Sequence, residues 1–155
     1  MSPASIAKHP IHPMIVPLPI GLWIFSLICD VIYRTASDNP LWDEMAFYSL
    51  LVGIGGALLA AVPGFIDFLS IADPRARRIA LTHLILNLVV VALYAVNAWL
   101  RSESPAGSST PFLLSIVAIM LLSVSGWLGG ELVYRHGVGI DRPSPAPGSR
   151  APKLG

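Results

Sequence analysis

The sequence predicts an all-α integral membrane protein: a four-helix bundle of transmembrane helices with the N and C termini both cytoplasmic. The first observation is composition, because 54% of the 155 residues are hydrophobic and only 12% are charged. Mean hydropathy is +0.69. An ordinary soluble domain is about 25% charged, so a lipid bilayer suits this chain better than water. The second and third observations are four long apolar segments and an uneven distribution of Lys and Arg.

Four segments are long enough to cross a bilayer, which requires about 20 mostly apolar residues in a helix. They lie at about 14–33, 46–70, 79–99 and 112–134. Turn-forming and polar residues separate them. We therefore expect a four-helix transmembrane domain over 14–139, preceded by a His/Pro-rich N-terminal arm over 1–13. The Pro-rich tail over 140–155 cannot bury a core and is predicted to be disordered.

Lys and Arg gather on one side of the predicted spans. That side receives Lys8, Arg75, Arg77, Arg78, Arg135, Arg142, Arg150 and Lys153. The other side receives only Arg34 and Arg101. Because short loops rich in Lys and Arg remain in the cytoplasm, both termini should face the cytoplasm.

Several classes of function are not expected. The formal net charge of +1 gives no basic patch for nucleic acid. The single cysteine, Cys29, cannot form an intrachain disulfide. No G-x-S-x-G motif, phosphate loop or H-E-x-x-H motif occurs in the sequence. An enzymatic activity is therefore not expected, and the lipid bilayer is the expected partner.

Proline and small residues predict how the spans pack. Pro63 lies within the second span, where it leaves the Leu59 carbonyl without its helical donor and should kink the helix. Small side chains allow membrane helices to approach closely. Such residues recur in the second and fourth spans, at Gly56, Ala60, Gly64, Gly126, Gly129 and Gly130. We therefore expect the second and fourth spans to pack against each other.

All four histidines fall on the predicted cytoplasmic side: His9, His12, His83 and His136. Histidine is the commonest metal ligand in proteins. In the segment 9–13, prolines favour polyproline II, which has three residues per turn and would project His9 and His12 to the same side. We therefore interpret the four histidines as a candidate metal or cofactor site.

Three further polar residues could support this site. Asp67 should either accept a hydrogen bond from His83 or pair with an arginine of the following loop. Asn87 shares a helical stripe with His83. Glu131 could be a ligand or could pair with Arg135, four residues later. At the other end, Asp30 and Arg34 are expected to form a surface pair.

Two runs of the sequence carry a resemblance to a known family. They are His9-Pro10-Ile11-His12-Pro13 and the glycine-rich run from Gly126 to Gly139, GWLGGELVYRHGVG. With them the chain resembles a bacterial family of four-span membrane proteins classed as a domain of unknown function. The resemblance implies an architecture and a bacterial inner-membrane location, but no reaction. Some relatives are joined to Rieske-type iron–sulfur domains, which implies a possible redox partner.

Three functions remain open from the sequence. The first is a redox or metal-binding membrane protein that holds haem b or a transition metal. The second is a non-catalytic membrane subunit or scaffold whose histidines pin the N-terminal arm to the bundle. The third is a proton or ion pathway through Asp67, His83, Asn87 and Tyr94; no inverted repeat is evident to support it, although a homo-oligomer would change that.

Overall fold

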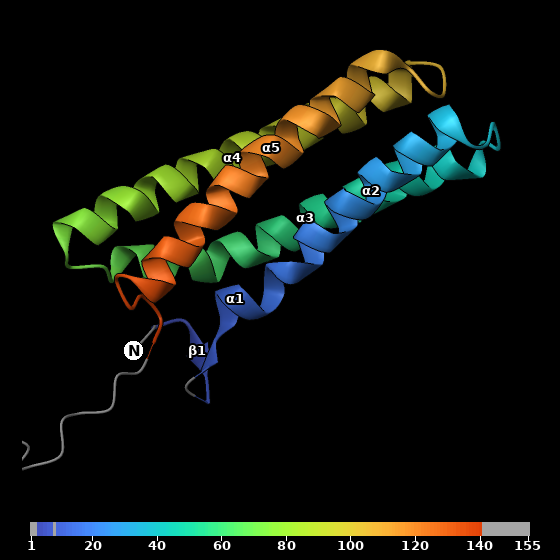
Figure 1. The fold of residues 1–155 in the computed structure, drawn as a ribbon. Helices are drawn as coiled ribbons and strands as arrows, with labels where there is room; N and C mark the ends of the chain where they lie inside the picture. Colours follow the sequence, from blue (N-terminus) through green and yellow to red (C-terminus); the bar gives the residue numbers. More distant parts are fainter. Residues whose placement is uncertain (1–2, 8, 141–155) are drawn as a thin grey trace, which may run out of the picture.

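Four long helices form an elongated bundle in the computed structural model, which describes residues 3–7 and 9–140 (Figure 1). The first span is divided into α1, Ile11–Ile15, and α2, Pro17–Thr35. The other three are α3, Leu41–Leu69, α4, Pro74–Glu103, and α5, Ser109–Tyr134. All four are long and apolar enough to cross a membrane, which confirms the predicted all-α bundle of four spans. The cytoplasmic orientation of the two termini stays a prediction. The predicted tail lies outside the described residues, apart from Ile140.

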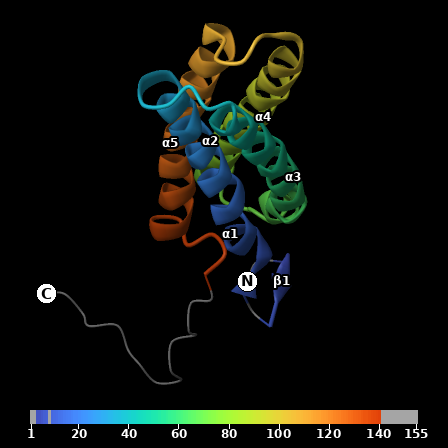
Figure 2. The same ribbon diagram turned by 90° about the vertical axis from the view of Figure 1, so that its right-hand side faces the viewer.

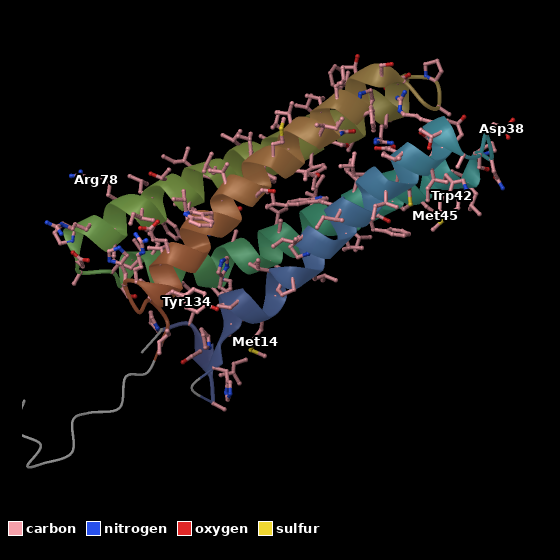
Figure 3. The ribbon with its side chains drawn as sticks, in the orientation of Figure 1. Met14, Asp38, Trp42, Met45, Arg78 and Tyr134 are labelled. Atoms are coloured by element: carbon pink, nitrogen blue, oxygen red, sulfur yellow. The ribbon has the colours of Figure 1, made fainter. Side chains whose placement is uncertain are left out.

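The two ends of the bundle differ in what they carry. One end holds the N-terminal arm, residues 70–73 and residues 135–140, and we call it the terminal end (Figure 2). The opposite end holds the loops at 36–40 and 104–108. Arg78 and Tyr134 lie toward the terminal end, whereas Asp38 and Trp42 lie at the opposite end (Figure 3). Among the described residues, Arg75, Arg77 and Arg78 begin α4 at the terminal end, whereas Arg34 and Arg101 lie in the last turns of α2 and α4, toward the opposite end.

The N-terminal arm folds back on itself before the first helix. Strand β1, Ser5–Ile6, pairs antiparallel with β2, His9–Pro10. The predicted polyproline geometry of 9–13 is wrong beyond Pro10, because α1 begins at Ile11 and contains His12. Pro13 is tolerated there because backbone N–H groups in a first helical turn have no helical partner.

The helices associate as two hairpins. α2 packs along α3, and α4 packs along α5; between the hairpins, α3 contacts α4 and α2 contacts α5. The expected glycine-mediated contact between the second and fourth spans is wrong, because a Cβ added at Gly126 or Gly130 would meet nothing within 4 Å. Gly56 instead admits Leu18 and Pro19 of α2.

The middle of the bundle is built around two aromatic rings from diagonal helices. Trp23 of α2 is 2% exposed and stacks on Tyr94 of α4, with ring centroids 4.3 Å apart and an interplanar angle of 15°. The Trp23 indole Nε1 donates to the Leu50 carbonyl at 3.3 Å. This stack holds α2 and α4 together at the centre.

A buried ion pair joins the same two helices near the opposite end. Asp30 is 4% exposed and accepts a hydrogen bond from Arg101 Nη2 at 2.5 Å. The predicted surface pair between Asp30 and Arg34 is therefore wrong, because Asp30 faces the bundle interior. Arg34 instead donates to the carbonyls of Gly107 and Ser108 at 2.6 and 2.5 Å.

Candidate functional site

His12 and His83 meet between the two hairpins in the half of the bundle that includes the terminal end. Their ring centroids are 6.4 Å apart and their planes are nearly perpendicular, at 88°. His12 comes from α1 and His83 from α4, which are 71 residues apart in sequence at these positions. Both side chains are half-buried. Two of the four histidines singled out from the sequence are therefore neighbours in space.

The His12 ring is held by α3. Its Nδ1 lies 2.8 Å from the Ala60 carbonyl oxygen, and since a carbonyl only accepts, Nδ1 must carry the proton. Pro63 lies three residues further along α3, where a proline disturbs the helical hydrogen-bond ladder. Gly64 makes room for the ring, because a Cβ there would lie 2.7 Å from His12 Nδ1.

The His83 ring is held by α5 in the same manner. Its Nδ1 lies 2.8 Å from the Ser125 carbonyl and 2.9 Å from the Ser125 hydroxyl. Asn87 Nδ2 lies 3.1 Å from His83 Nε2 and donates to the His83 carbonyl at 2.9 Å. A Cβ at Gly129 would lie 3.2 Å from His83 Cε1. The glycine again leaves space for an imidazole.

This arrangement fixes the tautomer of both rings. With Nδ1–H donated to a carbonyl, each Nε2 presents a lone pair. The Nε2 of His12 has no hydrogen-bond partner among the described residues, whereas that of His83 accepts from the Asn87 amide. A metal-binding histidine characteristically donates its other ring N–H to a carbonyl or carboxylate. Both rings share the Nδ1 anchor of such histidines, but only His12 leaves its Nε2 without a partner among the described residues.

The other two histidines have different partners. His9 is exposed, and its Nδ1 lies 2.9 Å from the Ala7 carbonyl of its own turn. His136 Nδ1 lies 3.3 Å from Asp73 Oδ2, next to the start of α4. Over residues 3–7 and 9–140, no group of three or more His, Cys, Asp or Glu side chains could hold a metal ion.

The three supporting residues also have separate positions. Asn87 contacts His83, as its place on the stripe predicts. Asp67 Oδ1 accepts from the Ala4 backbone N–H at 3.3 Å. The predicted hydrogen bond from His83 to Asp67 is wrong, because both His83 nitrogens are used by Ser125 and Asn87. Glu131 forms the alternative ion pair with Arg135, at 3.2 Å.

Four residues that shape the site were not recognised as such from the sequence: Ala60, Gly64, Ser125 and Gly129. Each histidine donates to the carbonyl of a residue on the neighbouring helix. Its ring also lies against the glycine that follows this residue by four positions on that neighbouring helix. Ala60, Gly64 and Gly129 stand out in the sequence only as small residues that predict close helix packing, and Ser125 gives no signal there.

Asp73 caps α4 at the terminal end, and this predicts a pH-dependent stability. Its carboxylate accepts from the backbone N–H of Arg75 and of Ala76, at 3.1 and 3.3 Å. These bonds, the Arg75 one foremost, and the nearby His136 lower the pKa of Asp73. A lowered pKa stabilises the fold above the carboxyl's ordinary value and loses that effect as pH falls through the lowered value.

Because Asn caps a helix about as well as Asp, Asp73→Asn removes mainly the charge at the helix N-terminus, and we expect it to lower Tm by about 1–3 °C at pH 7. The deficit should shrink as the pH is lowered below 4, which thermal melting in detergent across pH would measure. Asp38→Asn, in the exposed 36–40 loop, is the matched control and should leave Tm unchanged. A deficit for Asp73→Asn that stays constant down to pH 2 would contradict the assignment.

Four helices able to cross a membrane, with a polar cluster inside the bundle, define a multi-pass membrane protein. The chain belongs to the family described as "Predicted membrane protein (DUF2231)", whose model matches residues 8–142. The matched region includes His12, His83 and all five helices. Searches of curated proteins and of solved structures found no match.

Proposed function

We propose that this membrane protein holds a metal centre between His12 and His83 and uses it for electron transfer. The observation that carries the proposal is the pair itself: two imidazoles from different hairpins, 6.4 Å between centroids, each with Nδ1 anchored to a backbone carbonyl at 2.8 Å. Two nitrogens that share a metal ion lie about 4 Å apart, twice the usual metal–nitrogen bond. With centroids 6.4 Å apart, the two imidazoles are close enough to share one ion if their Nε2 atoms turn toward each other.

Two protein ligands leave the remaining coordination positions to a non-protein ligand. Haem b is one such group: His12 and His83, from facing helices, would hold it, and it would supply one-electron redox chemistry. A transition metal with bound small ligands is the other form of the same chemistry. On binding, the metal would replace the Asn87 amide at His83 Nε2. His9 and His136 have partners of their own, and we assign them no ligand role in this proposal.

The cellular setting follows from the sequence. The Lys- and Arg-rich terminal end would face the cytoplasm of a bacterial cell, across the inner membrane. The centre would then accept one electron and pass it on, with a Rieske-type protein as a candidate redox partner.

A second function has its own supporting observation. In the protein as described, both nitrogens of His83 are already satisfied by Ser125 and Asn87, without a metal. His12 likewise ties α1 to α3. The histidines would then act as cross-links in a non-catalytic membrane subunit or scaffold, pinning the N-terminal arm to the bundle.

Binding of two probes to the purified full chain in detergent tests the first proposal. We expect haemin or Cu(II) to bind at one equivalent per chain, haemin giving a Soret band. His12→Ala and His83→Ala should each weaken binding roughly tenfold or more. The controls His9→Ala and His136→Ala should leave it unchanged. If the wild-type chain binds neither probe, or if the control variants lose as much as the site variants, the proposal fails; a lowered Tm of His12→Ala alone would then favour the scaffold.

A further inference from the structure

The two hairpins place matching residues at matching positions. His12, Trp23 and Asp30 on α1 and α2 correspond to His83, Tyr94 and Arg101 on α4, each 71 residues later. Each residue contacts its own counterpart: the two imidazoles, the stacked aromatic rings and the ion pair. Three such self-matching contacts along one line are what a two-fold axis produces.

The second helices of the hairpins match with a separate offset of 65 residues. Ala60 and Ser125 supply the carbonyls that receive His12 and His83, both at 2.8 Å. Gly64 and Gly129 lie under the two rings. The second offset is shorter than the first although the two loops, 36–40 and 104–108, are equally long. The reason is that α4 and α5 extend fewer residues beyond the matched positions toward their loop than α2 and α3 do.

Another pair of equivalent contacts, one in each hairpin, lies away from the histidines. Ser26 Oγ donates to the Ala46 carbonyl at 2.7 Å, and Asn97 Nδ2 donates to the Pro111 carbonyl at 2.8 Å. Both bonds join the first helix of a hairpin to the second. The two donor residues are 71 positions apart in the sequence and the two acceptor residues are 65 positions apart, which are the same offsets as before.

The packing has the same symmetry. A two-fold operation that exchanges the hairpins turns the α2–α3 contact into the α4–α5 contact, and the α3–α4 contact into the α2–α5 contact; all four are present. α2 and α4 both run from the terminal end to the opposite end (Figure 1). The axis therefore runs along the bundle, as it does for parallel repeats in membrane proteins.

We infer that the chain consists of two copies of one helical hairpin, related by a pseudo-two-fold axis along the bundle, and that His12 and His83 are equivalent ligands on this axis. The second half of this statement rests on the proposed function. The equivalence of His12 and His83 implies that their ligand has two equivalent coordination positions, such as the two axial positions of haem iron. At Asp30 and Arg101 the symmetry is broken into opposite charges, which favours pairing of unlike hairpins over like ones.

Exchange of the ion pair tests the repeat without any ligand. Asp30→Arg and Arg101→Asp should each lower Tm in detergent by about 10 °C or more, since each buries two like charges. The double exchange should recover more than half of that loss. The remainder arises from the interactions that Asp43 and Asn97 make with Arg101, which the exchange does not restore. Asp30→Asn provides a milder single variant if the reversals do not fold. A double variant that loses the sum of the two single losses would overturn the repeat.

Cu(II) and haemin titrations test the equivalence of the ligands. His12→Ala and His83→Ala should weaken the binding of either probe by factors that agree within about threefold. Factors that differ more than tenfold would overturn the equivalence. If the wild-type chain binds neither probe, the proposed function fails, and the exchange of Asp30 and Arg101 still decides whether the hairpins are repeats.

Discussion

Apart from the charge reversals at the same site, Arg101→Met is expected to cause the largest loss of stability of any single substitution considered for this chain. The change leaves the Asp30 carboxylate 4% exposed and without the cation that lies 2.5 Å away. Breaking a buried ion pair in this way costs about 3–5 kcal/mol. The change also removes the bond from Arg101 Nε to Asn97 Oδ1 at 2.9 Å. Chemical or thermal unfolding in detergent measures the difference.

Two further variants show whether the buried charge is the cause. Asp30→Leu/Arg101→Met removes both charges, and it should recover much of the lost stability, because apolar replacements of a buried pair are often neutral. Arg135→Met removes an arginine whose side chain is 76% exposed, and it should cost less than about 0.5 kcal/mol. If Arg101→Met were as stable as the wild-type protein, the buried pair would not hold the hairpins together.

Gly64→Ala is expected to have the largest effect on ligand binding of any change outside the two histidines. The added Cβ would lie 2.7 Å from His12 Nδ1 and 2.9 Å from Cε1, so the ring must move. Its bond to the Ala60 carbonyl would then be strained or lost. Disturbing an anchor of a metal ligand weakens metal binding by about 10–100-fold, and titration with Cu(II) or haemin measures this.

Gly126→Ala is the matched control for this substitution. The control lies on α5, where an added Cβ would meet nothing within 4 Å. Replacement of glycine by alanine inside a helix favours the fold by up to about 1 kcal/mol. We therefore expect unchanged binding and an unchanged or slightly raised Tm for Gly126→Ala. Equal binding by the Gly64→Ala and wild-type proteins would contradict the role assigned to Gly64.

The helices were predictable because lipid imposes simple demands on sequence. Each span must be long, apolar and helical, and composition alone reveals such segments. The predicted spans overlap the observed helices and differ from them by a few residues at most ends, since helices such as α4 continue past the apolar stretch to Glu103. The Glu131–Arg135 pair was also predictable, because it depends only on a spacing of four along one helix.

Contacts between helices were harder to predict. Asp30 has Arg34 one turn away, but its partner is Arg101 on another helix. The rotation of each helix about its axis decides such pairings, and an apolar membrane helix has no polar face to reveal it. The hairpin repeat was hidden for a related reason. Its contacts are matched, but apart from the His12/His83 and Gly64/Gly129 pairs the matched residues differ, as Trp23 and Tyr94 do.

The histidine site was half predictable. Sequence pattern placed four histidines on one side of the membrane, and the structure brings His12 and His83 within 6.4 Å of each other. The pattern gave no sign that His136 would pair with Asp73 or that His9 would turn to Ala7. Those partners depend on how the arm and residues 135–140 fold back on the terminal end.

Pulsed EPR of the Cu(II)-loaded full-length protein tests the central claim most directly, because coupling to the remote imidazole nitrogen counts the histidines bound to the ion. We predict two equivalent imidazoles in the wild-type protein, one in His12→Ala and in His83→Ala, and two in His9→Ala and His136→Ala. A spectrum that shows no imidazole coupling in the wild-type protein, or one that neither His12→Ala nor His83→Ala changes, would contradict it.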